Sequence, residues 1–100
     1  MLTDRLDLQA LLKELCDNVY FQPPESIKLV YPCIVYKRDW AVTNFAENLP
    51  YKIVKRYLVT VVDRDPDSTI PAQVAELPMC VYDRFYTADD LNHDVYKLFF

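Results

Sequence analysis

The one combination in this 100-residue chain that could support covalent catalysis is its single histidine, His93, with a cysteine. A dyad of Cys80 or Cys33 with His93 would make a small thiol hydrolase, because the imidazole would take the thiol proton. Both cysteines lie in apolar runs typical of strands, where a buried thiol packs as a small hydrophobic group and is inert. We therefore expect no catalytic residue, and we expect His93 to be a structural histidine of a hairpin.

Three aspartates at alternate positions, Asp63, Asp65 and Asp67, come nearest to the pattern of a cation site. Carboxylates at this spacing bind calcium in a bent loop that has Gly at its sixth position and a bidentate Glu at its twelfth. These two positions hold Ser68 and Val74 in this chain. We therefore expect a solvated turn that leads into a helix, without a bound metal.

Residues 51–57 combine three basic residues with two tyrosines, and surfaces that bind single-stranded nucleic acid have this composition when they form a groove. In an extended chain Lys52 and Arg56 share one face and Lys55 lies on the other, so the three charges do not form a stripe. Tyr51 and Tyr57 supply the aromatic rings. The favoured interpretation is an ordinary strand surface or a protein-facing patch.

Two large aromatic residues, Trp40 and Phe45, lie in the polar stretch 39–50, which has no clean apolar period. The stretch is predicted to be a long loop. Exposed aromatic side chains often anchor protein interfaces, so Trp40 and Phe45 are candidate contact residues. The alternative is that the loop folds back and covers the sheet.

Composition excludes several classes of function. The chain has 0 Gly, which excludes Gly-rich phosphate loops, dinucleotide-binding fingerprints and nucleophile elbows, and requires turns built from Pro, Asn, Asp or Ser. A net charge of −4 argues against nonspecific binding to nucleic acid. The 3 cysteines are far apart, which fits neither a disulfide framework nor a zinc site. With no signal peptide and no membrane span recognisable, we expect an intracellular origin.

Apolar spacing predicts two helices and four strands in a single domain over residues 1–100. The first helix is expected from Thr3 to about Val19 and the second between Thr69 and Pro78. Strands are expected over residues 33–38, 51–62, 80–86 and 93–100, the first of them central and the last two joined as a hairpin. This order predicts an α+β fold, with a mainly antiparallel sheet of about four strands and both helices on one face.

Five segments carry a family resemblance: residues 31–36 (YPCIVY), 63–68 (DRDPDS), 77–80 (LPMC), 83–86 (DRFY) and 88–94 (ADDLNHD). Together they resemble small virion proteins of long-tailed bacteriophages. The closest functional class is the tail terminator, also called the tail completion protein, with head-tail joining proteins as near relatives.

This resemblance implies a small α+β subunit that assembles as a ring, commonly of six copies, at the head-proximal end of the tail tube. The ring ends tube polymerisation and presents a surface to the head. The implied partners are further copies of the chain, the major tail tube protein and the head-tail connector protein, with DNA only as passing cargo and no membrane. The resemblance implies no enzyme activity and no cofactor, and a place in the virion after synthesis in the host cytoplasm.

A ring subunit needs two unlike patches that meet head to tail. We call Asp63, Asp65 and Asp67 the acidic corner. Its charge is opposite to that of the face with Lys52 and Arg56, and the attraction between them would fix the register between neighbours. The candidate interface residues are Trp40, Phe45, Lys52, Arg56, Asp63, Asp65 and Asp67. The alternatives are a head-tail connector or stopper and, from other classes, a small intracellular Cys-His hydrolase or an adaptor.

Overall fold

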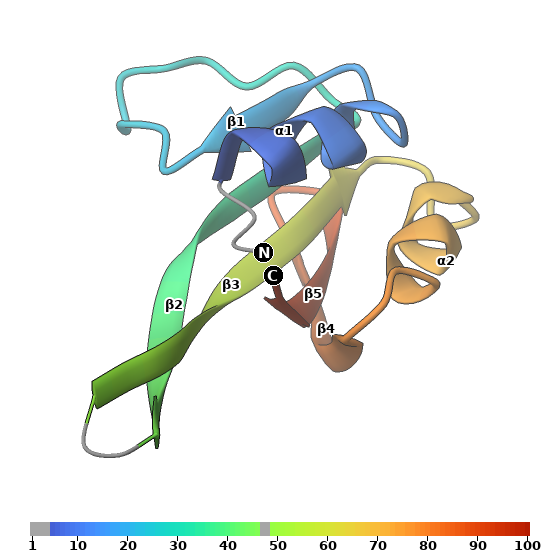
Figure 1. The fold of residues 1–100 in the computed structure, drawn as a ribbon. Helices are drawn as coiled ribbons and strands as arrows, with labels where there is room; N and C mark the ends of the chain where they lie inside the picture. Colours follow the sequence, from blue (N-terminus) through green and yellow to red (C-terminus); the bar gives the residue numbers. More distant parts are fainter. Residues whose placement is uncertain (1–4, 47–48) are drawn as a thin grey trace.

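The strands of this chain form one mixed sheet with two helices on one of its faces (Figure 1). A computed structural model describes residues 5–46 and 49–100, without the side chains of residues 42–54. The strand order is β1-β2-β3-β5-β4, in which only β1 and β2 are parallel. In chain order the elements are α1 (Arg5–Lys13), β1 (Val19–Phe21), β2 (Cys33–Ala46), β3 (Leu49–Asp63), α2 (Ile70–Ala75), β4 (Cys80–Ala88) and β5 (Leu91–Phe99).

The predicted α+β class is confirmed, but the predicted sheet was wrong in two respects. The sheet has five strands where about four were expected, and β3 is its central strand where residues 33–38 were expected to be. The alternation predicted for β3 is confirmed, because Tyr57, Val59 and Val61 are buried toward the helices. Leu58 and Thr60 on the other face are only partly buried.

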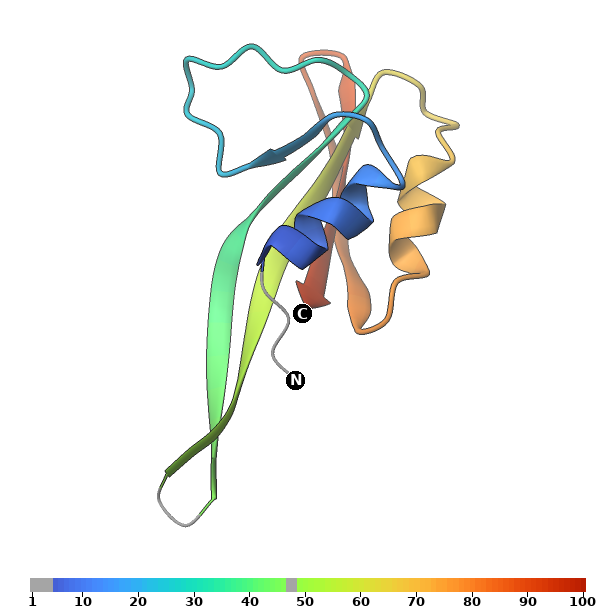
Figure 2. The same ribbon diagram turned by 45° about the horizontal axis from the view of Figure 1, so that its top comes forward.

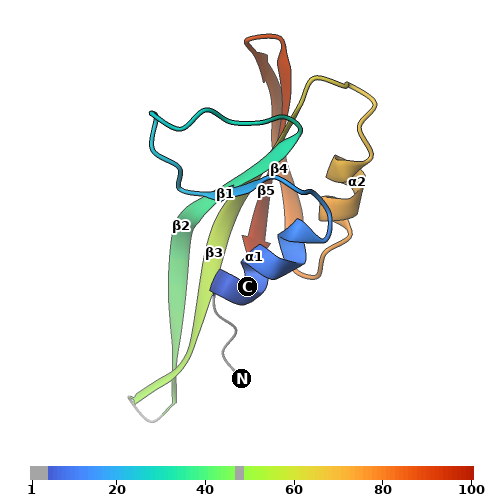
Figure 3. The same ribbon diagram turned by 90° about the horizontal axis from the view of Figure 1, so that it is seen from above.

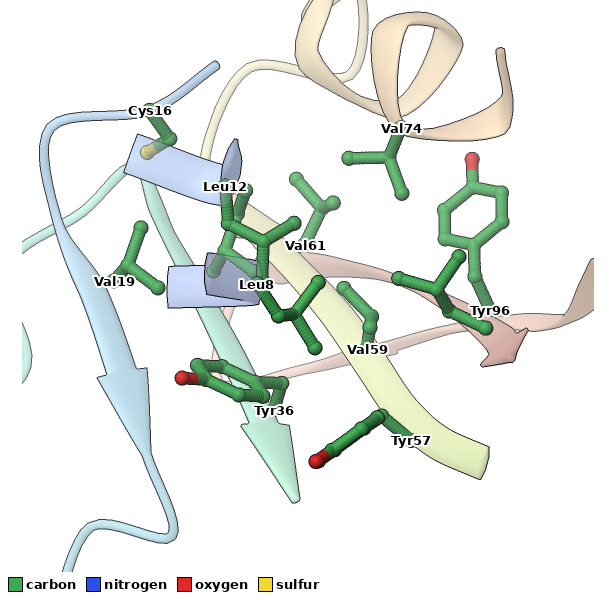
Figure 4. Close-up of a cluster of buried hydrophobic side chains, with 12 residues drawn as sticks. Leu8, Leu12, Cys16, Val19, Tyr36, Tyr57, Val59, Val61, Val74 and Tyr96 are labelled. Carbon is green, nitrogen blue, oxygen red and sulfur yellow. The ribbon is translucent and has the colours of Figure 1, made fainter. Parts of the chain in front are cut away.

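Both helices pack their apolar side chains on the same face of the sheet. Leu8 and Leu12 of α1 and Val74 of α2 have no exposed surface, and they meet side chains from β2, β3 and β5 (Figure 4). The phenol of Tyr36 lies beneath α1, where it donates a hydrogen bond to Oε1 of Gln9. Within the described residues, no helix is long and apolar enough to cross a membrane.

The first helix ends earlier than its apolar spacing predicted. It stops at Lys13, and Val19 begins the short strand β1, which runs parallel to residues 34–36 of β2. The intervening Asn18 fixes this change, because its carbonyl accepts the Ile34 amide at 2.8 Å and its side-chain amide donates to the Pro32 carbonyl at 3.1 Å. Val19 is buried in β1, and an apolar residue at this spacing is expected to be buried in a helix as well, so its spacing alone did not distinguish a helix from a strand.

The loop predicted over residues 39–50 was wrong for residues 39–46 and 49–50, where β2 and β3 pair as a long antiparallel hairpin; residues 47–48 lie outside the described residues. We call residues 39–46 and 49–55 the arm; there β2 and β3 pair with each other and with no other described strand. The arm projects beyond the rest of the sheet (Figures 2 and 3). Two register shifts, at Arg38/Trp40 and Asn44/Phe45, interrupt the alternation along β2, so the sequence shows no clean period of two.

The predicted C-terminal hairpin is confirmed as β4 and β5. Its two turn residues, Asp89 and Asp90, have φ of 54° and 62°, the combination that tight hairpin turns require and that usually calls for Asn or Gly. A register shift between Tyr82 and Arg84 separates two aromatic residues that simple alternation placed together. Tyr82 pairs with Tyr96 on the helix side of the sheet, and Tyr86 pairs with His93 on the other side.

The core predicts how two leucines of α1 will respond to truncation. Leu12→Ala should lower the free energy of unfolding by about 2–5 kcal/mol, because Leu12 is 0% exposed and the truncation leaves a cavity. Leu6→Ala is the matched control, since Leu6 is 63% exposed and its truncation should change stability by no more than about 0.5 kcal/mol. Urea denaturation followed by circular dichroism measures both, and equal losses would contradict the described packing of α1.

Candidate functional site

Trp40 and Arg56, two of the predicted interface residues, face each other across β2 and β3 where the arm begins. Nε of Arg56 donates to Oδ2 of Asp39 at 2.7 Å, and the guanidinium carbon lies 5.1 Å from the centroid of the Trp40 ring. Trp40 remains 53% exposed. The cluster therefore presents a broad aromatic surface, while the charge of Arg56 is largely balanced within its own chain.

Phe45 and Lys52, the other two candidates in this region, both belong to the arm. Phe45 pairs with Pro50, and Lys52 pairs with Asn44. Their side chains lie outside the described part of the structure. The backbone thus places both residues on the projecting hairpin, and their role in an interface stays a prediction.

The acidic corner begins at Asp63, the last residue of β3, whereas Arg56 lies in the middle of that strand, about 23 Å away at the rise of an extended strand. Oδ1 of Asp63 accepts the amide of Asp65 at 3.0 Å, and Oδ1 of Asp65 accepts the amide of Asp67 at 2.9 Å. The side chain of Asn92 ties the corner to β5 by donating to the Asp63 carbonyl at 3.1 Å. Two of the three carboxylates therefore stabilise the turn by accepting backbone amides, in agreement with the predicted turn.

The structure does not assemble a metal site at this corner. Across the described ranges 5–46 and 49–100, no group of three His, Cys, Asp or Glu side chains is placed to hold a metal ion. Ser68 Oγ accepts the Ile70 amide at 3.3 Å, which starts α2 directly after the corner. These contacts give the acidic corner a structural role and leave its charge free to act on a partner.

The proposed nucleic-acid patch is not formed as its spacing suggested. Tyr57 is 2% exposed and belongs to the core, so its ring is not available to stack on a base. Arg56 is bound to Asp39. The patch therefore loses one aromatic ring and much of one charge, although Lys55 and Arg56 are both partly exposed.

The strand register separates Cys80 from His93. Cys80 pairs with Leu98 and packs against the core under the helices, whereas His93 lies five positions earlier on β5, about 17 Å along the strand and on the other face. The imidazole stacks on Tyr86, with a ring separation of 4.5 Å and an interplanar angle of 12°. This dyad, which the hydrolase alternative required, is therefore not assembled.

Cys33 shares the face of His93 but stands two strands away, with Val62 between them. Its side chain is 0% exposed, and burial raises the pKa of the Cys33 thiol to about 12. Burial also raises the pKa of Cys16 and of Cys80. A nucleophilic thiolate at neutral pH is disfavoured at all three positions.

Strand β4 forms an exposed apolar edge that sequence reasoning did not single out. Only β5 pairs with it among the described strands. We call Val81, Tyr82, Phe85 and Tyr86 the β4 patch; their side chains are 58%, 52%, 52% and 41% exposed. The alternation of large apolar residues was visible in the sequence, but their exposure depends on β4 being the outermost strand.

The face of the sheet away from the helices is partly open and continues the β4 patch. A hollow of about 310 Å³ lies on it, and its lining joins apolar residues such as Leu58 and Val95 to Arg84 and Tyr86 of β4. Lys37 and His93 also line it. Tyr86 therefore joins the β4 patch to this hollow, whose lining is mainly apolar and includes Lys37 and Arg84, whereas Tyr82 lies on the helix side of the sheet.

Charge is divided unevenly along the chain. We call residues 37–56 the basic segment; they hold five Lys or Arg and two Asp or Glu, a net charge of +3. The other 80 residues hold six Lys or Arg and 13 Asp or Glu, a net charge of −7. The hairpin that contains the arm and the remainder of the molecule are therefore electrostatically complementary.

The ion pair between Arg56 and Asp39 should give a measurable coupling free energy. Arg56→Ala, Asp39→Ala and the double variant should give a coupling free energy of about 0.2–1 kcal/mol in a double-mutant cycle, as partly exposed pairs usually do. Lys97 and Asp83, whose N–O distance is 3.8 Å against 2.7 Å, form the matched control and should couple more weakly. Unfolding followed by the fluorescence of Trp40, the only tryptophan, provides the measurement. The reverse order of coupling would contradict the described contact.

Buried acidic groups predict a loss of stability in alkali. Burial raises the pKa of the Cys33 thiol from 9.0 to about 12 and that of the Tyr96 phenol from 10.0 to about 12. The unfolded chain therefore releases these protons at a lower pH than the folded chain, so the free energy of unfolding is fully present below pH 9 and decreases as the pH rises toward 12. Urea denaturation at a series of pH values measures this slope. Cys33→Ala should make the slope shallower, and an unchanged slope would contradict the role of Cys33.

Comparison of the chain with protein-family models, with curated proteins and with solved structures finds no match. The candidate site therefore rests on the geometry described above. It consists of two unlike surfaces, the projecting hairpin with its basic segment and the exposed apolar edge on an acidic body.

Proposed function

We propose that this chain is a structural virion protein of a long-tailed bacteriophage, which forms a ring at the head-proximal end of the tail tube. In this role it ends tube polymerisation and provides the surface to which the head is joined. The observation that carries the proposal is the presence of two unlike surfaces, the basic hairpin and the exposed β4 patch on an acidic body. A closed ring of identical subunits requires such a pair, because each copy uses a different surface toward each neighbour.

The shape of the subunit supports the same role. The arm extends the long axis of a molecule whose principal extents are 51 × 28 × 23 Å, so the hairpin can reach past its own body to a neighbouring subunit (Figure 3). Both helices cover one face of the sheet, which leaves the opposite face and the β4 edge for protein contacts. The resemblance of five segments between residues 31 and 94 to small virion proteins of long-tailed bacteriophages adds the place of the ring in the particle.

The charge distribution suits a ring through which DNA passes. The acidic corner and the turn at Asp89 and Asp90 lie at the same end of the sheet, where Asn92 connects Asp63 to β5. Carboxylates that face the passage would repel phosphate, so DNA would pass without being held. In the proposed ring, the acidic end accordingly faces the passage and the basic segment faces protein.

Electron microscopy of a lysate from the phage that lacks this gene tests the proposal. Overlong tail tubes that never join heads are the expected result, because nothing would cap the growing tube. Tails of normal length beside unattached heads would contradict termination and assign the chain to the head-tail connector instead. Intact infectious particles would overturn both roles. Supplying the wild-type chain from a plasmid is the control, and it should restore normal tails joined to heads.

A further inference from the structure

We infer that β4 of one copy of this chain pairs, as an antiparallel strand, with the outer edge of β2 in the arm of the next copy. The partner of the β4 patch is then a second copy of this chain. This inference deepens the proposed ring and rests on it for the number of copies and for their place in the particle. The contact itself is argued from the strand edges, the strand directions and the charges of the described residues.

The β4 edge has little of the protection that an isolated protein needs. Edge strands usually avoid pairing with other chains by being short, by carrying Lys or Pro, or by bulging. β4 spans Cys80–Ala88, contains neither Lys nor Pro, and has one bulge next to Asp83. The β4 patch places large apolar side chains on both faces of this edge, so a strand added here would find apolar contacts above and below the sheet.

The outer edge of β2 becomes free where the arm begins. Val19–Phe21 of β1 covers only Ile34–Tyr36, and the side chain of Gln22 accepts the Arg38 amide at 3.2 Å. From residue 39 to residue 46, no described strand lies on this edge. These 8 residues are close in length to the 9 residues of β4, so a second copy can supply a matched strand.

The strand directions permit this contact without reversing the second copy. β2 is antiparallel to β3, β3 to β5 and β5 to β4, so β2 and β4 run in opposite directions. A copy placed beside β4 in the same orientation therefore presents its β2 as an antiparallel neighbour. The free residues 39–46 of β2 extend past the first residue of β4 in the direction of the strands. The two copies must therefore be shifted along the strands by about 27 Å, the length of 8 strand residues. Stagger of this kind, with tilted strands, is what allows a sheet to close on itself.

Charge selects this head-to-tail contact over the symmetric pairing of two β4 strands. The hairpin formed by β4 and β5 carries Asp83, Asp89, Asp90 and Asp94 against Arg84 and Lys97, so two such hairpins would repel each other. The basic segment, with its net charge of +3, would instead lie beside this acidic hairpin. Symmetric pairing would also close after two copies and leave the arm edge unpaired.

Sedimentation velocity of the purified full chain over a concentration series, combined with amide hydrogen exchange, tests the contact. We expect concentration-dependent assembly beyond a dimer, with slower exchange in both β4 and residues 39–46 of the assembled species and unchanged exchange in β1. Phe85→Lys, which introduces the residue that edge strands use against pairing, should raise the apparent dissociation constant at least about tenfold. Leu6→Lys is the matched control, because Leu6 is an exposed apolar residue on α1, and it should assemble as the wild type does.

Mixing two variants distinguishes the head-to-tail contact from a symmetric one. Arg38→Glu alters the charge of the basic segment and leaves β4 intact, whereas Phe85→Lys alters β4 and leaves the arm intact. At a concentration at which the wild type assembles and neither variant does, an equal mixture should form a dimer of one copy of each, because the unaltered basic segment of one copy then meets the intact β4 of the other. Lys28→Glu is the control for charge reversal outside the basic segment and should leave assembly unchanged.

Three results would overturn the inference. They are a protein that stays monomeric at every concentration, a dimer with slowed exchange in β4 alone, and an assembly in which the exchange of neither β4 nor residues 39–46 changes. None of these would by itself remove the proposed function, which is tested in phage that lack the gene and fails there if tails of normal length lie beside unattached heads or if intact particles form. The inferred contact and the proposed function can therefore fail separately, since one is tested on purified protein and the other in the infected cell.

Discussion

Burial of one face of β3 is the constraint on which the rest of this structure depends. Val59 and Val61 are 0% and 1% exposed, and the side chains that cover them come from helices of only 9 and 6 residues. Helices this short are not stable alone in water, so α1 and α2 exist because their apolar side chains pack on the sheet. The sheet and the helices therefore stabilise one another, and neither forms a separate unit.

Because two short helices cover only part of the sheet, the surfaces that they leave uncovered remain available to partners. The two helices cover one face of the sheet over its body, whereas the arm extends beyond them and the opposite face is only partly closed. Strand β4 is outermost, so its large side chains are shared between the protein and the solvent. A small domain with so much unpaired strand edge gains stability from a neighbour that pairs with it, which gives assembly a physical basis within the fold itself.

Because the chain has no glycine, aspartate fills several of its turn positions, and these turns are therefore acidic. Asp89 and Asp90 adopt positive φ in the β4–β5 turn, and Asp63 and Asp65 hold the corner after β3 through their side chains. Aspartate suits these positions because its short polar side chain bonds to nearby backbone amides and tolerates the left-handed region. The same choice makes one end of the molecule acidic, so local turn chemistry and the long-range electrostatic asymmetry have a common origin.

Local patterns in the sequence determined the α+β class, the alternation of β3, the second helix and the C-terminal hairpin, because each depends on neighbouring residues in one segment. The charge of the basic segment and of the acidic corner was also present in the sequence. Tertiary structure alone decided that residues 39–46 pair with β3 as an arm, that Val19 leaves the helix for β1, and that Cys80 and His93 lie on opposite faces. It also decided that Phe85 is exposed. Pairing partners, bulges and the position of a strand at the centre or the edge of a sheet are set by contacts between distant segments, and no local period in the sequence encodes them.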